Sequence, residues 1–429
     1  MKRSIKILLI ISVYFLLPLG IHALDYPALD SKILEIYDLT DKKVIKEIDS
    51  NKQTSIASLT KIVTTITAIE NITNLDEQVT ITNAILNTVR WDASKAGLRA
   101  GDVLTYRDLL YASMLPSGAD ATNSIAILSS GSIDNFVSKM NDLVSKLELK
   151  NTHFVNVTGL DIEGHYSTAD EIRKILEYSL KNELFRKIYT TREYTLSNGL
   201  TVYSTITTYN KTGLVDTSKI IGSKTGYTGD AGYCLSSLSN INSHEFIIIV
   251  LNAEHKNNRY YNIVDTTTLI NFLEENFKEQ LLISKGEVIK TIPIKLSKTK
   301  KYEIKTKKNI TKYLPSDYDK EKIKVEYTGL EKLSYKNKKN EKIGEVSYYY
   351  DNELITKDTI LLKEKIEVSI KKVILTYYYQ FIILLVIIIG LLTIVIKRKK
   401  RKRKKSLKQG WYSLLFLCDY VNIKAGFKT

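Results

Sequence analysis

The chain has 429 residues and a formal net charge of +16, with 63 Lys and Arg against 47 Asp and Glu. Nine consecutive basic residues, 397–405, supply +9 of that charge and leave +7 (16 − 9) for the rest of the chain. The basic balance therefore indicates a membrane stop signal rather than a nucleic-acid-binding surface, and no zinc-finger or RNA-binding aromatic signature accompanies it.

Residues 1–23 are predicted to be a signal peptide. Lys2, Arg3 and Lys6 form a basic start, residues 7–20 form an apolar stretch, and Ala23 is a suitable last residue before cleavage. An uncleaved membrane anchor is the alternative interpretation of the same pattern.

Residues 24–280 carry mixed strand and helix signals. Alternation predicts strands at 32–37, 43–48, 220–228, 232–239 and 245–252, and helical periodicity predicts helices after Ser58 and at 106–115, 133–147, 168–180 and 265–277. This pattern is typical of an α+β fold, with an antiparallel sheet and flanking helices. Shorter alternating runs at 286–362 predict a small all-β domain.

Residues 373–396 contain no charged residue and are long enough to span a bilayer as a C-terminal transmembrane helix. The positive-inside rule places the basic cytoplasmic tail, 397–429, inside the cell and everything before Val373 outside. The expected location is the cell membrane, as a single-pass protein. Within the tail, residues 411–417 are expected to be disordered rather than bound to the membrane surface. Cys234 and Cys418 would lie on opposite sides of the membrane, so we expect no internal disulfide.

The most informative motif is Ser58-Leu-Thr-Lys61, at the start of a helix without Gly or Pro. Three residues apart on a helix, Ser58 and Lys61 share one face. A desolvated lysine can take the proton of a hydroxyl and make it a nucleophile. The same spacing at Ser297–Lys300 and Ser369–Lys372 lies among other lysines in β-like sequence, where a lysine would keep its charge.

Two further motifs follow in the order expected for enzymes of the penicilloyl-serine type. Leu115-Pro-Ser117-Gly-Ala lies at a helix end or in a loop, and Gly222-Ser-Lys224-Thr225-Gly226-Tyr227 lies on a predicted strand. Two serines and a lysine can pass a proton from a nucleophile to a leaving amine. Lys224 and Thr225 can bind a carboxylate, and Gly226 lets a substrate backbone lie against the strand.

With these motifs the chain resembles the serine-type D-Ala-D-Ala carboxypeptidases, the low-molecular-mass penicillin-binding proteins. The resemblance extends to Lys150-Asn-Thr-His-Phe and to Ala231-Gly-Tyr-Cys, and covers residues 25–275 closely. It implies a β-lactamase/transpeptidase-like catalytic domain, and it fits a β-rich second domain and a membrane anchor at the C-terminus.

The resemblance also implies a role for each matching residue. Ser58 forms the acyl-enzyme, Lys61 takes its proton, and Ser117 belongs to the proton relay. The substrate carboxylate and peptide are bound by Lys224, Thr225, Gly226 and Arg259. The backbone N–H groups of Ser58 and Tyr227 form the oxyanion hole. No metal or cofactor is implied.

One position departs from the family pattern, because Ala119 stands where the second motif usually has asparagine. That amide normally holds the substrate's peptide group and the lysine, and alanine can do neither. The resemblance therefore leaves the rate and the β-lactam affinity open.

The sequence predicts a membrane-anchored enzyme that trims the terminal D-Ala from peptidoglycan stem peptides, with β-lactams as inhibitors and the lipid bilayer as its other partner. A β-lactamase is one alternative, although Glu163, Glu171 and Glu177 lack the sequence context of a deacylating glutamate. A tethered wall-binding or scaffold protein with a decayed site is the other. The sequence contains neither a zinc-protease H-E-x-x-H nor a G-x-S-x-G nucleophile elbow.

Overall fold

The computed structural model describes residues 24–209, 215–256 and 259–425, with side chains up to residue 415. The predicted signal peptide lies outside the described residues. The chain divides into two compact units. The first runs to Glu279 and also includes Tyr313–Tyr318, and the second comprises Gln280–Lys312 and the chain from Asp319 onward. The short return of Tyr313–Tyr318 to the first unit falls inside the range predicted as a separate β domain.

The first unit is built on a five-stranded antiparallel sheet in the order β2-β1-β9-β8-β7. The central strand β9 is buried on both faces, because alternate residues of 246–251 enter two different hydrophobic clusters. Such a strand needs helices on both sides of the sheet. The strands of this sheet are β1 (Ile33–Asp38), β2 (Lys43–Ile48), β7 (Ile220–Thr228), β8 (Gly232–Ile241) and β9 (His244–Ala253).

The helices cover the two faces unequally. Helix α10 packs on β8 and β9 on one face, and α2 is the buried centre of the group on the other. The helices are α2 (Thr60–Asn71), α3 (Asn83–Leu86), α4 (Tyr106–Met114), α5 (Ala119–Ser130), α6 (Ile133–Lys146), α7 (Ala169–Ser179), α8 (Glu183–Thr190), α9 (Thr205–Tyr209) and α10 (Tyr261–Asn276). Short strand pairs complete the unit: β3 (Gln78–Thr80) with β4 (Val103–Thr105), β5 (Glu193–Thr195) with β6 (Thr201–Tyr203), and β10 (His255–Lys256) with β11 (Arg259–Tyr260).

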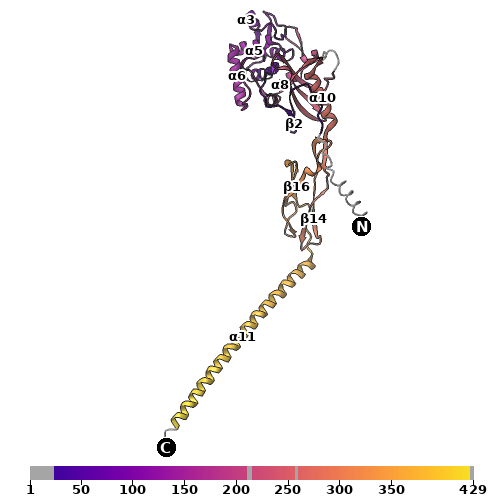
Figure 1. Ribbon diagram of the computed structural model, residues 1–429. Helices are drawn as coiled ribbons and strands as arrows, with labels where there is room; N and C mark the ends of the chain where they lie inside the picture. Colours follow the sequence, from indigo (N-terminus) through magenta and orange to yellow (C-terminus); the bar gives the residue numbers. More distant parts are fainter. Residues whose placement is uncertain (1–23, 210–214, 257–258, 426–429) are drawn as a thin grey trace, which may run out of the picture. The chain divides into compact units, whose positions relative to one another are not determined.

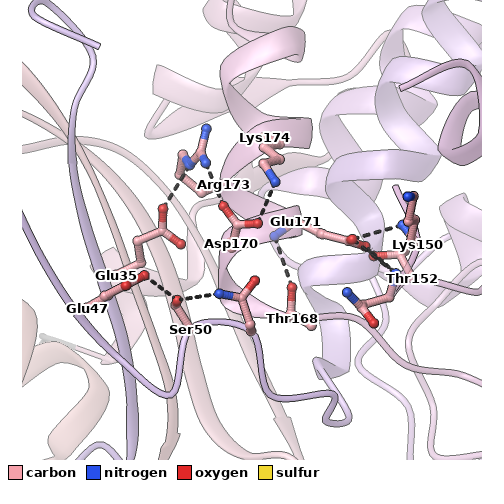
Figure 2. A network of polar contacts seen from close by, with 12 residues as sticks. Glu35, Glu47, Ser50, Lys150, Thr152, Thr168, Asp170, Glu171, Arg173 and Lys174 are labelled. Atoms are coloured by element: carbon pink, nitrogen blue, oxygen red, sulfur yellow. Dashed lines mark hydrogen bonds and ion pairs between the residues drawn. The ribbon is translucent and has the colours of Figure 1, made fainter. Parts of the chain in front are cut away.

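A polar network fixes α7 and the loop before it (Figure 2). Glu171 accepts hydrogen bonds from the backbone N–H groups of Lys150 and Asn151 and from Thr152 Oγ1. On the same helix, Arg173 binds the fully buried Glu35 of β1 at 2.9 Å. Helix α7 is thereby joined both to the central sheet and to the loop at residues 150–152.

The second unit contains two three-stranded sheets around a core of aliphatic side chains and Tyr348. The first sheet has the order β14-β13-β17 and the second β16-β18-β19. The strands are β13 (Val288–Lys295), β14 (Lys301–Lys305), β16 (Ile323–Gly329), β17 (Leu333–Ser334), β18 (Lys342–Tyr350) and β19 (Glu353–Leu361). Strand β12 (Phe277–Ile283) pairs with β15 (Ile310–Pro315).

Helix α11 (Ile370–Ala425) follows the β-rich unit (Figure 1). It is long and apolar enough to cross a membrane, and its apolar stretch is not buried against the rest of the protein. The predicted α+β fold with a β-rich second domain and an apolar C-terminal helix is confirmed. The prediction that residues 411–417 are disordered is wrong, because α11 continues through them. The Lys and Arg residues of the preceding basic block are good helix formers and allow the helix to continue.

Candidate active site

Ser58 lies in a single 3₁₀ turn, η1 (Ala57–Leu59), which leads directly into α2. Lys61 lies one turn later, and its Nζ is 3.0 Å from Ser58 Oγ. The same Nζ donates a hydrogen bond to the backbone oxygen of Thr158 at 2.8 Å. The contact expected from the S-x-x-K spacing is therefore present, and an amine held in this way can exchange a proton with the hydroxyl.

Burial changes the proton affinity of Lys61, whose side chain is almost completely enclosed. The loss of hydration lowers the pKa of Lys61 to about 7, although the carboxylate of Asp120 acts in the opposite direction. Near neutral pH a large fraction of the amine is thus uncharged, which is the form that can accept the proton of Ser58.

The second and third motifs meet the first at this point. Ser117 lies between α4 and α5 with a φ of +61°, an uncommon value for a residue with a side chain. Its buried Oγ accepts a hydrogen bond from Lys224 Nζ at 2.9 Å. Burial and the neighbouring Lys61 hold the pKa of Lys224 well below its usual range. The three motifs therefore place two serines and two lysines around one point.

Strand β7 forms the wall of the site opposite the second motif, and it is an edge strand of the central sheet. A side chain at Gly226 would begin 3.0 Å from the backbone N of Ser58, so only glycine allows this close approach. Tyr227 follows with its side chain 55% exposed, and its ring stacks on Tyr233 with centroids 4.3 Å apart. An edge strand beside the nucleophile can take up an extended substrate backbone.

Ser58, Lys61, Ser117, Gly226 and Tyr227 line a cavity of about 140 Å³, whereas Lys224 is buried and does not line it. Ala119 lies in its wall, at the first position of α5. Arg259 lies outside that wall, on the exposed face of β11, so its predicted contact with a substrate carboxylate stays a prediction. The lining residues are Ser58, Lys61, Asp92, Ala93, Ser94, Ser117, Ala119, Thr158, Gly159, Leu160, Tyr209, Thr225, Gly226, Tyr227 and Thr228.

The other two S-x-x-K copies form no similar site. Ser297 Oγ donates to the backbone oxygen of Glu367 at 2.9 Å, and Lys372 Nζ binds the backbone oxygen of Ser297. Both copies lie in the second unit, remote in the chain from the other motifs.

Two carboxylates that shape the cavity were not predicted from the sequence. Asp120 is buried and accepts hydrogen bonds from the backbone N–H groups of Ala96, Gly97 and Leu98. These residues directly follow the loop 92–94, which lines one side of the cavity. Asp161 accepts from Thr228 Oγ1 at 2.8 Å and ties the opposite loop to β7. The only sequence feature that could have pointed to Asp120 is its position directly after the second motif, Ser117-Gly-Ala.

A chain of hydrogen bonds behind the nucleophile was also missed. The backbone N–H of Val155 donates to His165 Nδ1, so the ring proton lies on Nε2, 2.9 Å from Thr60 Oγ1. The Thr60 hydroxyl in turn donates to the backbone oxygen of Ala57 at 2.9 Å. Burial lowers the pKa of His165 to about 4, which keeps the ring neutral. His153 lies outside the cavity and donates a hydrogen bond through Nδ1 to the backbone oxygen of Gly164.

Comparison with known sequences gives two family matches. The profile of the D-alanyl-D-alanine carboxypeptidases matches residues 22–255, and that of the C-terminal domain of penicillin-binding protein 5 matches residues 277–368. A D-alanyl-D-alanine carboxypeptidase, DacF of Bacillus subtilis (strain 168), is 29% identical over 75% of this chain and 82% of its own length. A second, from Streptomyces sp. (strain K15), is 38% identical over 44% of this chain and 69% of its own length.

Solved structures agree on the fold. The chain is similar to penicillin-binding protein 5 from Haemophilus influenzae, with a TM-score of 0.56 at 23% identity over 80% of this chain and 100% of that one. It is also similar to the Streptomyces K15 DD-transpeptidase, with a TM-score of 0.52 at 28% identity over 58% of this chain and 98% of that one. On the family matches and the site geometry, the chain belongs to the serine D-alanyl-D-alanine carboxypeptidases.

Proposed function

We propose that this chain removes the terminal D-alanine from peptidoglycan stem pentapeptides through an acyl-enzyme on Ser58, and that β-lactams inhibit it by acylating the same oxygen. The observation that carries this proposal is the pair formed by Ser58 Oγ and the buried Lys61 Nζ, 3.0 Å apart. A serine beside an amine whose pKa is lowered to about 7 can be deprotonated at neutral pH.

In the proposed reaction, Lys61 takes the Ser58 proton as Oγ attacks the carbonyl carbon of the penultimate D-Ala residue. The oxyanion forms against the backbone N–H groups of Ser58 and Tyr227. Ser117, joined to Lys224, donates its proton to the nitrogen of the terminal D-alanine as the C–N bond breaks, and Lys61 passes the Ser58 proton on to Ser117, which leaves Lys61 neutral. Water then attacks the ester carbonyl carbon and gives a proton to Lys61, the Ser58–acyl bond breaks, and Lys61 returns that proton to Ser58 Oγ.

The same geometry supports a proposed mode of substrate binding. We propose that Lys224 and Thr225 bind the terminal carboxylate and that the peptide backbone lies along the free edge of β7 at Gly226. Arg259 would approach the same carboxylate from β11. The exposed Tyr227 side chain at the mouth of the cavity would contact the rest of the stem peptide.

A β-lactamase is less well supported. Such an enzyme needs a carboxylate that activates water for deacylation. Among the residues that the structure describes, none of the three candidate glutamates lines the cavity: Glu163 is exposed, Glu171 is bound to the 150–152 loop and Glu177 to Arg173. The carboxylate that does line the cavity, Asp92, is paired with Arg90 at 2.6 Å. A decayed scaffold is less well supported because the Ser58–Lys61 and Ser117–Lys224 contacts are intact.

We further propose that α11 anchors the enzyme as a single span, with the catalytic unit outside the cell and the basic residues after Ile396 in the cytoplasm. The helix is long and apolar enough for this role. A peptidoglycan-trimming enzyme needs this placement, because its substrate lies outside the membrane.

The test is the release of D-alanine from a muramyl pentapeptide by the full-length protein. We expect release by the native chain, none by Ser58→Ala, and native release by Ser369→Ala, which changes a serine with the same S-x-x-K spacing. Undiminished release by Ser58→Ala would overturn the assignment of the nucleophile, and no release by the native chain would favour the scaffold.

A further inference from the structure

The β-rich unit contains a groove of about 440 Å³ that the reaction does not use. It lies between β14, an outer strand of one sheet, and the end of β19, an outer strand of the other, with residues 362–366 along it. Its floor is apolar and reaches the core of the unit at Ile304, Ile360 and Leu362. Ligand pockets of this size are commonly apolar, with a few charged groups that orient the ligand.

The rim of the groove is cationic. Five lysines line it, against two glutamates, which leaves an excess of three positive charges: Lys301, Lys305, Lys307, Lys363 and Lys365 against Glu303 and Glu364. Glu303 is already shared between Lys301 and Lys305. An apolar floor below an excess of lysines is complementary to an anionic amphiphile, because lysine heads reach a charged group while their stems cover apolar surface.

The groove lies close to the point where the chain enters the apolar helix. Lys372, one residue before the apolar stretch begins at Val373, donates through Nζ to the backbone oxygen of Ser297 at 2.8 Å. Two residues after Ser297, Thr299 lines the groove. Ser369 is bound to the same turn, through its N–H and the backbone oxygen of Leu296 at 2.8 Å. These contacts fix the start of α11 beside the groove.

The edge strands themselves are poorly suited to binding a peptide by strand addition. The outer strand β14 has a lysine at each end, Lys301 and Lys305, and charged edges of this kind discourage pairing with another strand. Lys307 Nζ also donates to the backbone oxygen of Thr359, so part of the β19 edge is occupied.

We propose that this lysine-rimmed groove binds an anionic phospholipid of the bilayer that α11 enters, with the phosphate at the lysine rim and the beginning of an acyl chain on the apolar floor. The proposal rests on α11 lying in a membrane and is independent of the peptidase activity. Lysines next to a membrane span attract anionic lipids, and a groove beside the span would make this attraction selective for one bound lipid. Its consequence would be a β-rich unit held at the membrane surface.

The test uses the full-length protein in nanodiscs that contain a photoactivatable phosphatidylglycerol or the matching phosphatidylcholine. Cross-linked peptides are mapped with a protease that does not cut at lysine. We expect phosphatidylglycerol to label the segment 361–366 and β14, at least ~10-fold more than phosphatidylcholine does. Lys363→Gln with Lys365→Gln should lower this labelling by a similar factor.

The matched control is Lys336→Gln with Lys338→Gln, which removes the same charge from exposed positions outside the groove and should leave labelling unchanged. Both double variants should keep the circular-dichroism spectrum and the melting temperature of the native chain, which shows that the β-rich unit is folded. Equal labelling of the groove variant and the native chain, or labelling confined to α11, would overturn the proposal. Competition by millimolar inorganic phosphate, or displacement by an acidic peptide, would assign the groove to those ligands and also overturn it.

Discussion

Lys61 and Lys224 are two buried lysines with few carboxylates to balance them. Asp120 is the carboxylate that acts on Lys61, and its oxygens are already bound by four backbone N–H groups. Burying an ammonium group is costly, and proteins avoid that cost by releasing a proton. Burial lowers the pKa of Lys61 to about 7, and this favours a neutral amine next to Ser58, as general-base catalysis requires.

Lys61→Arg tests this role, because a guanidinium stays protonated at any working pH. A general base commonly contributes about 10²–10⁴-fold, so acylation by a fluorescent penicillin should slow by that factor. In the native chain the acylation rate should rise with pH through about 7, where Lys61 loses its proton, and then level off. Lys187→Arg, at an exposed position, is the control. A loss of less than tenfold would mean that Lys61 only positions Ser58.

Ala119→Asn tests the departure from the family pattern. Ala119 lies in the cavity wall, where an asparagine amide could bind the substrate's peptide group in the transition state. One such hydrogen bond is worth ~1–3 kcal/mol, so turnover of the pentapeptide should rise roughly five- to a hundredfold. Unchanged turnover in a folded Ala119→Asn variant would show that another group already holds that amide.

For single residues, the sequence predicted the site positions whose side chains are proposed to take part in the reaction. Ser58, Lys61, Ser117 and Lys224 were all singled out, and the structure brings them together. Thr158 could not be found in this way, because it contributes a backbone oxygen that any residue type could supply. Arg259 was chosen from the resemblance alone, and its side chain is exposed on β11.

At the scale of the elements, the turn η1 contains a strained residue, Ala57, next to the N–H group of Ser58. Ala57 has a φ of +49°, and its peptide unit carries the N–H of Ser58 that is proposed for the oxyanion hole. Such strain persists where neighbours over-determine the backbone. Here Thr60 Oγ1 binds the Ala57 oxygen, and Gly159 packs so closely that an added Cβ would lie 1.8 Å from that oxygen.

Thr60→Val should therefore slow acylation while Thr60→Ser restores it. Valine keeps the shape but loses the hydrogen bond to Ala57, and one neutral hydrogen bond corresponds to roughly tenfold in rate. The loss should fall on kcat rather than on KM, because the oxyanion forms only in the transition state. A Thr60→Val enzyme as fast as the native one would show that Thr60 does not position this turn.

Three helices with an amphipathic pattern, α4, α6 and α7, were predicted from the sequence within a residue or two at each end, but α8, which is also amphipathic, was not predicted. Helix α5 was missed because residues 119–126 are all buried, so no polar face marks its period. Helix α10 starts four residues earlier than predicted, at Tyr261. The return of Tyr313–Tyr318 to the first unit depends on long-range packing that no local pattern encodes.

The whole molecule joins a catalytic unit, a β-rich unit and an apolar helix in one chain. The proposed topology predicts that protease added to intact protoplasts removes residues 24 to about 370 and leaves a fragment that contains α11. A tag after Thr429 would identify the fragment, and permeabilised cells serve as the control for protease access to the tag. Full protection of the catalytic unit in intact protoplasts would reverse the orientation.

The central claim is that Ser58 is the residue acylated, and peptide mapping after exposure to benzylpenicillin tests it most directly. Intact-protein mass spectrometry should show one penicilloyl group on the native full-length chain, and the digest should place it on the peptide that contains Ser58. The Ser58→Ala variant should show no adduct, and Ser369→Ala should show the native one. An adduct on any other residue, or its persistence in Ser58→Ala, would contradict this account.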